Sequence, residues 1–222
     1  RYTDDLWRAP MPSLADRPHR LRELFVEGRR QVRARYPNLV PEDPLYDGWL
    51  FTRPTDVPQA IGFERGVFER EWAQPTEGEV YYAWGFIPIR RRDDGDAALE
   101  GGYQPPNMRF RVENLLEEID QPGEWCAYAA EGAVYLWPPE GIADIESAEV
   151  VAPVLDCLIE VNGASWLTIS GFRFTETTGG QVPYRDGLDG YGAFMPPKGS
   201  LPDYCGEAIH LLDVDHCVVE DS

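Results

Sequence analysis

The sequence predicts an all-β protein, with an antiparallel β domain followed by the start of a parallel β-helix. Two observations predict this fold. Residues 21–145 are short strand-like runs separated by turn formers, in a chain that has 20 Pro, 21 Gly, 7 Trp and 11 Tyr. From residue 146 the pattern changes, and one segment recurs 50 positions later along the chain. Aromatic residues and turn formers together suit short strands joined by elaborate loops.

The first elements follow from local pattern. Residues 1–20 contain several prolines without a period, and we expect a lead-in from an upstream region. The run at residues 24–26, the turn Glu27-Gly28 and the run at residues 31–36 predict a hairpin. Because the chain begins at Arg1 without Met and stops in mid-pattern, we expect it to be part of a longer protein.

The middle of the antiparallel domain is expected to hold two strands and a short helix. Residues 78–90 suggest one long strand, and residues 108–112 alternate apolar and basic residues, which predicts a strand with one wet face. Asn114 and Glu117 have capping-box spacing, which predicts a helix over residues 115–120.

The domain is expected to close with a hairpin. Residues 125–129 and 134–137 are strand-like and flank the turn Glu131-Gly132. Two arginines near its start, Arg33 and Arg35, are interpreted as strand-surface charges, although they could also reach a cleft.

The repeat defines the second part, residues 146–222. The segment LIEVNGASWLTIS (158–170) aligns without a gap with AIHLLDVDHCVVE (208–220), so that Ile159 falls on Ile209 and Ile169 on Val219. Such self-similarity indicates stacked units that bury their apolar faces against one another. A step of 50 residues is too long for one plain coil, so we expect a loop excursion over residues 177–206.

Four segments resemble the right-handed parallel β-helix glycoside hydrolases, including β-xylosidase-like and fucosidase/xylanase-like bacterial proteins. They are LFVEGRRQVRARYPN, FRVENLLEEIDQPGEW, GAVYLWPP and IEVNGASWLTISGFRF. The resemblance implies a right-handed parallel β-helix with an inserted antiparallel β-sandwich-like domain, secreted or periplasmic. It implies a hydrolase acting on plant or microbial polysaccharide or oligosaccharide. Two alternatives stay open, a polysaccharide lyase and a non-catalytic carbohydrate-binding or surface protein, because one scaffold hosts many functions.

The charge balance bears on partners. There are 20 Lys and Arg against 39 Asp and Glu, a net charge of −19. This charge argues against nucleic acid and anionic lipid as partners. The chain also lacks an apolar run of the ~20 residues that a spanning helix requires. We therefore expect a polysaccharide or oligosaccharide partner.

The candidate binding residues are on the repeat and in the excursion. The 50-residue register stacks Glu160 on His210, which suits either sugar binding or a simple cross-strand pair. A long loop rich in Tyr and Asp suits either a sugar cleft or a solvated flap. The candidates for substrate binding are Glu160, Asp186, Asp189, Tyr204, Glu207 and His210.

The catalytic residues are expected beyond Ser222, so that these 222 residues alone should be inactive. Retaining glycosidases hold two carboxyl groups ~5–5.5 Å apart, close to the ~4.8 Å spacing of stacked coils, and inverting enzymes hold them ~6.5–9.5 Å apart. Metal and cofactor are expected to be absent, with calcium considered only for a lyase. Asp213, Asp215 and Asp221 are too few for a calcium site, which takes ~6–8 oxygens.

Overall fold

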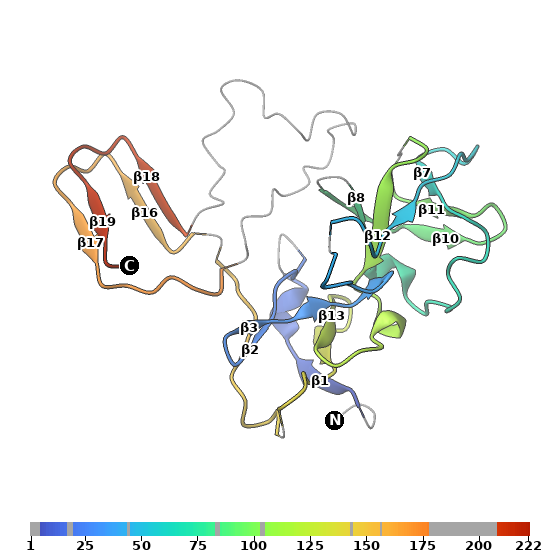
Figure 1. The fold of residues 1–222 in the computed structure, drawn as a ribbon, viewed down its shortest axis with the longest axis horizontal. Coiled ribbons are helices and arrows are strands. Elements are labelled where there is room, and N and C mark those ends of the chain that lie inside the picture. The colour runs from blue at the N-terminus through green and yellow to red at the C-terminus, as the bar shows by residue number, and fades with distance from the viewer. Residues whose placement is uncertain are drawn as a thin grey trace.

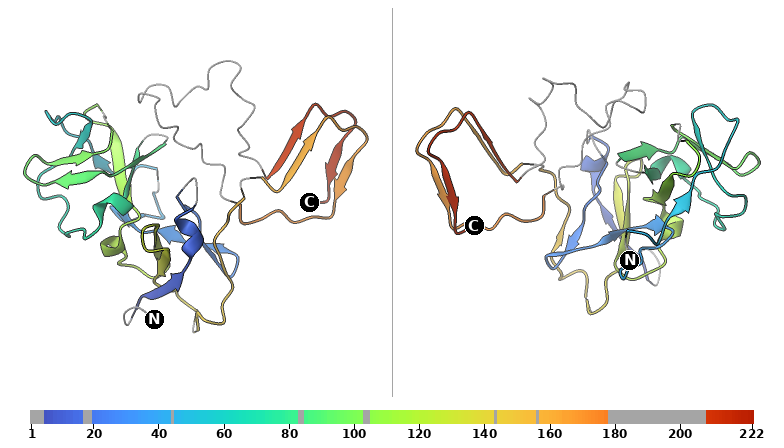
Figure 2. Two further views of the ribbon diagram at one scale, coloured as in Figure 1. Left: turned by 180° about the vertical axis from the view of Figure 1, so that it is seen from behind. Right: turned by 45° about the horizontal axis from the view of Figure 1, so that its top comes forward.

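The computed structural model is almost entirely β-structure and describes residues 5–16, 20–43, 45–82, 85–102, 105–142, 144–155, 157–177 and 208–222. Figures 1 and 2 show a body built from β1–β15, antiparallel except for the parallel pairing of β13 with β4, and an arm formed by β16–β19. No helix in these ranges is long and apolar enough to cross a membrane.

The first sheet has four strands in the order β1 (Trp7–Pro10), β14 (Ala133–Leu136), β13 (Glu124–Tyr128) and β4 (Val32–Arg33). The β13–β14 hairpin confirms the one predicted around Glu131-Gly132. The expected lead-in supplies β1, which pairs antiparallel with β14. It also supplies the buried Leu14, on a 3-10 turn at Pro12–Leu14. The sequence conceals this strand because three of its four residues are exposed and it has no alternating apolar pattern.

The second sheet contains β5 (Arg35–Tyr36), β12 (Arg109–Glu113), β8 (Glu79–Tyr82) and β9 (Gly85–Pro88), with β6 (Leu50–Phe51) also paired to β12. The predicted strand over residues 108–112 is thus β12. The single long strand predicted over residues 78–90 is wrong, because that segment is the hairpin β8–β9. Val80 and Ile87 are both buried in one core, although their odd separation would put them on opposite faces of one continuous strand.

Two three-stranded sheets complete the body. One contains β10 (Arg91–Asp93), β11 (Ala98–Glu100) and β7 (Ala60–Gly62), and the other β15 (Val150–Val151), β2 (Phe25–Val26) and β3 (Arg29–Arg30). The turn predicted at Glu27-Gly28 is confirmed, with both residues at positive φ, but the strand that pairs with β2 is β3 and not the predicted run at residues 31–36. Strand β3 ends at Arg30, and the chain then enters the four-stranded sheet as β4.

The predicted capped helix over residues 115–120 is wrong. The segment forms one 3-10 turn, Leu116–Glu118, with no side-chain cap, after a 3-10 turn at Pro75–Glu77 earlier in the chain. Asn114 is buried with φ of 66°. Its side chain accepts a hydrogen bond from the Ala127 N–H at 2.9 Å and donates to the carbonyls of Ala127 and Glu77. These bonds join two sheets, so Asn114 is not available to cap a helix.

The arm carries the repeat. Strand β16 (Ile159–Asn162) pairs in parallel with β18 (Ile209–Leu212), and β17 (Thr168–Ser170) pairs in parallel with β19 (Val218–Glu220). Ile159 lies opposite Ile209 and Ile169 opposite Val219, which confirms the predicted register. Within the described residues the two ladders do not close into a solenoid.

The backbone conformation of the turns in the arm repeats at the same interval as the strands. Three pairs of residues 50 positions apart share the left-handed conformation. Gly163 and Asp213 have φ of 66° and 50°, Trp166 and His216 62° and 51°, and Gly171 and Asp221 78° and 50°. Only some residue types enter this region easily, Gly, Asn, Asp and His among them. The conformation therefore recurs with the 50-residue repeat, and Trp166 adopts it despite its bulk.

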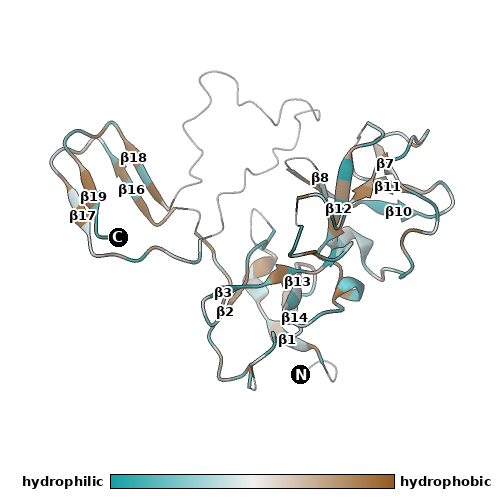
Figure 3. Cartoon of the chain, in the orientation of Figure 1, coloured by the Kyte–Doolittle hydropathy of each residue, from teal (hydrophilic) through white to brown (hydrophobic). Residues whose placement is uncertain are grey.

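The arm leaves much apolar surface open. Strand β19 is coloured hydrophobic in Figure 3, and Val218 and Val219 are 46% and 43% exposed. Ile169 is the buried apolar residue of the β17–β19 ladder. The arm is therefore a pair of parallel two-stranded ladders whose apolar side chains have little covering them in the described part of the chain.

Candidate functional site

The most unusual side-chain cluster in the body lies on one face of the sheet that contains β12. We call it the arginine face, and its members are Arg22, Arg33, Arg35, Trp49, Glu79, Tyr81, Phe86, Arg109, Arg111 and Glu113. Strand alternation creates it, because Phe110 and Val112 of β12 enter the main core while Arg109, Arg111 and Glu113 project to the other side. Tyr81 lies opposite Arg111 in the register, and Glu79 opposite Glu113.

The buried end of the face is a network of ions centred on Glu79. Arg33 Nη1 lies 2.6 Å from Glu79 Oε2, and Arg22 Nη2 lies 2.9 Å from Glu79 Oε1. Arg33 Nη1 is also 3.6 Å from Glu113, which accepts a 2.5 Å bond from Arg111 Nε. Burial disfavours the carboxylate, but the charges of Arg33 and Arg22 outweigh it and lower the pKa of Glu79 to about 2. Glu79 is therefore ionised at neutral pH and cannot act there as a proton donor.

The interpretation of Arg33 and Arg35 as surface charges is wrong. Their exposed fractions are 6% and 5%. Both flank Ala34, which is fully buried, so this stretch is covered on both faces. The sequence gives no sign of this, because the acidic partners of Arg33 lie at positions 79 and 113, far away along the chain.

The open end of the face is a stack of rings and guanidinium groups. Arg111 Cζ lies 4.7 Å from the Trp49 ring centre and 4.1 Å from that of Tyr81. Phe86 continues the stack at 4.8 Å from Tyr81, and Arg22 covers Phe86 at 4.1 Å. Guanidinium groups over aromatic faces are attracted by the ring quadrupole.

Two further arginines surround Trp49 without a carboxylate partner in the described ranges. Arg35 donates to the carbonyls of Pro37 at 2.9 Å and Gly48 at 2.5 Å, and Arg109 donates to the carbonyl of Leu45. Their Cζ atoms lie 5.8 and 5.9 Å from the Trp49 ring. Burial and the nearby charge of Arg111 lower the pKa of Arg35 to about 10. The cations at this end thus outnumber the groups that could neutralise them.

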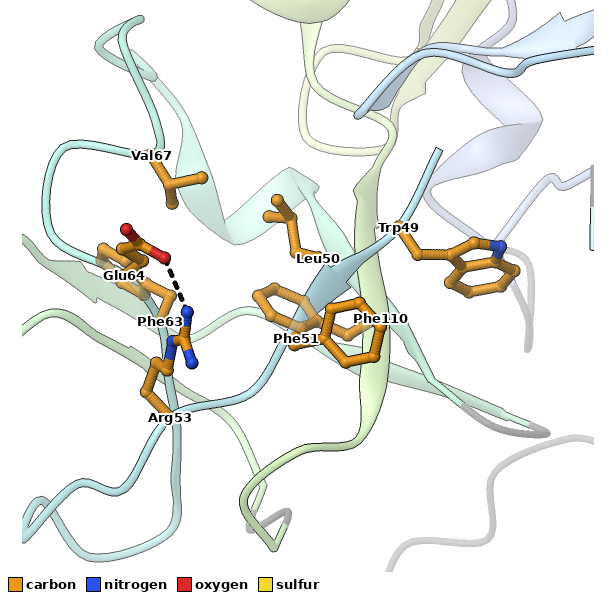
Figure 4. A pocket seen from close by; sticks show the side chains of 8 residues that line it. All are labelled: Trp49, Leu50, Phe51, Arg53, Phe63, Glu64, Val67 and Phe110. Atoms are coloured by element: carbon orange, nitrogen blue, oxygen red, sulfur yellow. Dashed lines mark hydrogen bonds and ion pairs between the residues drawn. The ribbon is translucent and has the colours of Figure 1, made fainter. Parts of the chain in front are cut away.

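A small hollow of about 150 Å³ borders the same sheet. Figure 4 shows Arg53, Glu64 and Val67 on one side of β12 and the Trp49 ring on the other. Arg53 and Glu64 form a 2.7 Å ion pair at the mouth of the hollow. Its other lining residues are Leu50, Phe51, Phe63 and Phe110. Apart from this ion pair, whose charges neutralise each other, the lining is mostly apolar, so we do not assign a binding site to the hollow.

One buried carboxyl has a pKa near neutrality. Glu124 is 2% exposed, and burial raises its pKa to about 7 against the hydrogen bonds that it accepts. Those bonds come from the N–H groups of Asp120 at 2.8 Å and Gln121 at 3.1 Å. Because Glu124 fixes a turn beneath the sheet, we assign it a structural role.

The predicted binding residues fall into two groups. Glu160 and His210 lie opposite each other in the β16–β18 ladder, as the register required. Their role in binding stays a prediction. The others lie outside the described residues, namely Asp186, Asp189, Tyr204 and Glu207.

Sequence reasoning missed a second pair on the arm. The rings of Trp166 and His216 stack with centroids 4.0 Å apart and planes at 12°, and Trp166 is 75% exposed. The His216 Nδ1 atom lies 2.7 Å from Asp215 Oδ2. The 50-residue alignment already placed Trp166 over His216, so the signal was present.

Metal chemistry has little support in the described part of the chain, where no group of three or more His, Cys, Asp or Glu side chains is positioned to hold an ion. The calcium alternative for a lyase stays an untested prediction. Cys126, Cys157 and Cys217 are free thiols.

Comparisons with known proteins show a fold likeness. No protein-family model matches the chain, and no curated protein matches it. A solved structure named "Glycoside hydrolase" aligns with a TM-score of 0.56 at 23% sequence identity. The alignment covers 77% of this chain and 34% of that one, so the chain spans about a third of that neighbour. The likeness shows that a glycoside hydrolase contains this arrangement of strands.

Proposed function

We propose that this chain belongs to a carbohydrate-active protein, a glycoside hydrolase built on a right-handed parallel β-helix. The observation that carries the proposal is the coil repeat, in which strands and left-handed turn positions recur at one interval of 50 residues. The fold likeness to a protein named as a glycoside hydrolase supports it. On this proposal, β16–β19 belong to the opening coils, the body is a domain beside them, and the protein is exported.

The scaffold suits the chemistry for a geometric reason. Stacked coils repeat at ~4.8 Å, so carboxylates at equivalent positions of neighbouring coils meet the ~5–5.5 Å separation of retaining hydrolases. Glu160 and His210 are such equivalent positions, with Glu160 exposed and His210 half-buried. We assign them to substrate binding at the edge of the cleft, with the two catalytic carboxylates on other coils.

The first prediction concerns this pair. In the full-length protein, Glu160→Gln should lower kcat/KM on oligosaccharide by about tenfold, since one good polar contact is worth about 1.4 kcal/mol. The matched control is Glu220→Gln, which removes an exposed carboxylate from β19 in the other ladder. If Glu160→Gln and the control both keep the kcat/KM of wild type, the Glu160 carboxylate does not bind substrate, and the assignment of the Glu160–His210 pair to the site is wrong.

The assay also decides the reaction class. Hydrolysis of xylo- or fuco-oligosaccharides produces new reducing ends only, whereas elimination by a lyase leaves an unsaturated product that absorbs in the ultraviolet. Reducing ends without absorbance support the proposal. Absorbance would establish the lyase alternative, and binding to a polysaccharide column with neither signal would establish a binding protein.

A further inference from the structure

We propose that the open end of the arginine face binds an oligosaccharide in which one unit is a uronic acid and the other sugars are neutral. The sugar class rests on the proposed function, whereas the requirement for negative charge rests on the residues of the face alone. The elements that form the site are β8, β12 and the segment before β6.

The first step is the charge of the face. The face has five arginines and two carboxylates. Arg22, Arg33 and Arg111 pair with Glu79 or Glu113. Glu79 also lies 3.9 Å from Arg20, which leaves still less negative charge for the other arginines of the face. The rest of the molecule is strongly acidic, since the whole chain carries −19. A cationic patch on an anionic protein attracts a small anion locally, while the overall charge repels a long polyanion such as a nucleic acid. A single acidic group on a neutral chain satisfies both conditions.

The second step is which of these cations is accessible. Arg22 and Arg33 are committed to Glu79, and Arg35 is buried and held by backbone carbonyls. Arg109 is exposed, and in the described ranges no carboxylate lies within 4 Å of it. Half-buried Arg111 lies beside it on the same face of β12 and contacts Glu113 through Nε. The two guanidinium groups can meet a carboxylate with paired N–H donors, the geometry that arginine favours.

The third step is the aromatic surface beside the charge. Tyr46 is 74% exposed, and Arg109 Cζ lies 5.7 Å from its ring centre. Trp49 and Tyr81 continue the surface, with ring centroids 5.8 Å apart. Rings next to cations suit a pyranose with a carboxylate, because the C–H face of the sugar packs on a ring while its acid reaches the arginine. At this end of the face, the covered Trp49 Nε1 has no hydrogen-bond partner in the described part of the chain. This end of the face therefore has a hydrogen-bond donor that the described residues leave unpaired.

The test compares two probes by titration calorimetry, a xylo-oligosaccharide with one glucuronate branch and the unbranched oligosaccharide of equal length. The wild-type protein should bind the branched probe at least about tenfold more tightly at low salt, and added salt should reduce the preference by screening. Arg109→Gln should abolish the preference, and Tyr46→Ala should weaken binding of both probes.

The control is Arg65→Gln, which changes an exposed arginine whose guanidinium, among the described residues, donates to the backbone carbonyl of Asp94 and lies within 4 Å of no carboxylate. This variant should keep the full preference. Equal affinity of wild type for both probes, an unchanged preference in Arg109→Gln, or full competition by inorganic sulfate would each overturn the inference. If the full-length protein hydrolyses oligosaccharides without an acidic preference, only this inference fails. If it prefers the acidic probe but hydrolyses nothing, only the proposed function fails.

Discussion

At the scale of single residues, the protein separates two kinds of buried carboxyl. Glu79 is surrounded by arginines and keeps its charge, whereas Glu124 is covered with no ion pair in the described residues and tends to hold its proton. Both contribute to structure, but with opposite dependence on pH. A raised pKa in the folded state means that stability is greatest below the unfolded pKa and declines as pH rises toward the folded pKa.

The pH dependence of Glu124 gives a prediction. Its pKa rises from 4.5 to about 7 on folding, so its ionisation should cost stability between pH 4.5 and 7. Glu124→Gln keeps an oxygen acceptor for the N–H groups of Asp120 and Gln121 and removes the ionisation. The variant should match wild type near pH 4 and exceed its free energy of unfolding by about 2–3 kcal/mol at pH 8. Chemical denaturation at both pH values checks this, with the exposed Glu140→Gln as control. A constant difference across pH would show that Glu124 ionises normally.

At the scale of elements, strand β1 has no sequence pattern that predicts it, yet it covers the β14 edge of the four-stranded sheet. It occupies the edge of the four-stranded sheet through its pairing with β14, and the turn that follows buries Leu14. An uncovered edge strand exposes a row of hydrogen-bonding groups and favours association between chains.

Removal of β1 should therefore destabilise the body. Deleting residues 1–16 removes β1, one of the two strands paired with β14, and the Leu14 side chain. The loss of the buried Leu14 side chain alone should lower the free energy of unfolding by about 2–5 kcal/mol. The Tm should fall by about 5–15 °C, with more aggregation. Deleting residues 1–4 is the control, because it leaves β1 (Trp7–Pro10) intact. If both deletions have the same Tm, the β1 contribution is negligible.

At the scale of the whole molecule, local and long-range patterns differ in what the sequence predicts. The repeat predicted the register of the arm to the residue, because Ile159 and Ile209 carry the same two-residue period. The β13–β14 hairpin and the turn between β2 and β3 followed from their turn residues. By contrast, Asn114 has the spacing from Glu117 that is typical of a helix N-cap, but its side chain forms hydrogen bonds to Glu77 and Ala127 and so links two sheets. These partners are set by tertiary packing, which the local sequence does not show. The arginine face escaped prediction for the same reason: its ions come from five separate strands or loops.

The coil proposal makes a last prediction, on the dynamics of the arm. Two-stranded ladders are marginally stable alone, and the valines of β19 are nearly half exposed, so local opening should be easy. In the 222-residue chain, backbone amides of β16–β19 should exchange with deuterium at least about 100-fold faster than those of β13 and β14, which lie in buried cores. A longer form of the protein, in which further coils stack on these ladders, should protect the amides of β16–β19 to the level of the body. Hydrogen exchange with mass spectrometry measures both forms, and β13–β14 serves as an internal reference. If the arm exchanges equally fast in the longer protein, its apolar faces are not covered by further coils, and the parallel β-helix is the wrong fold for this protein.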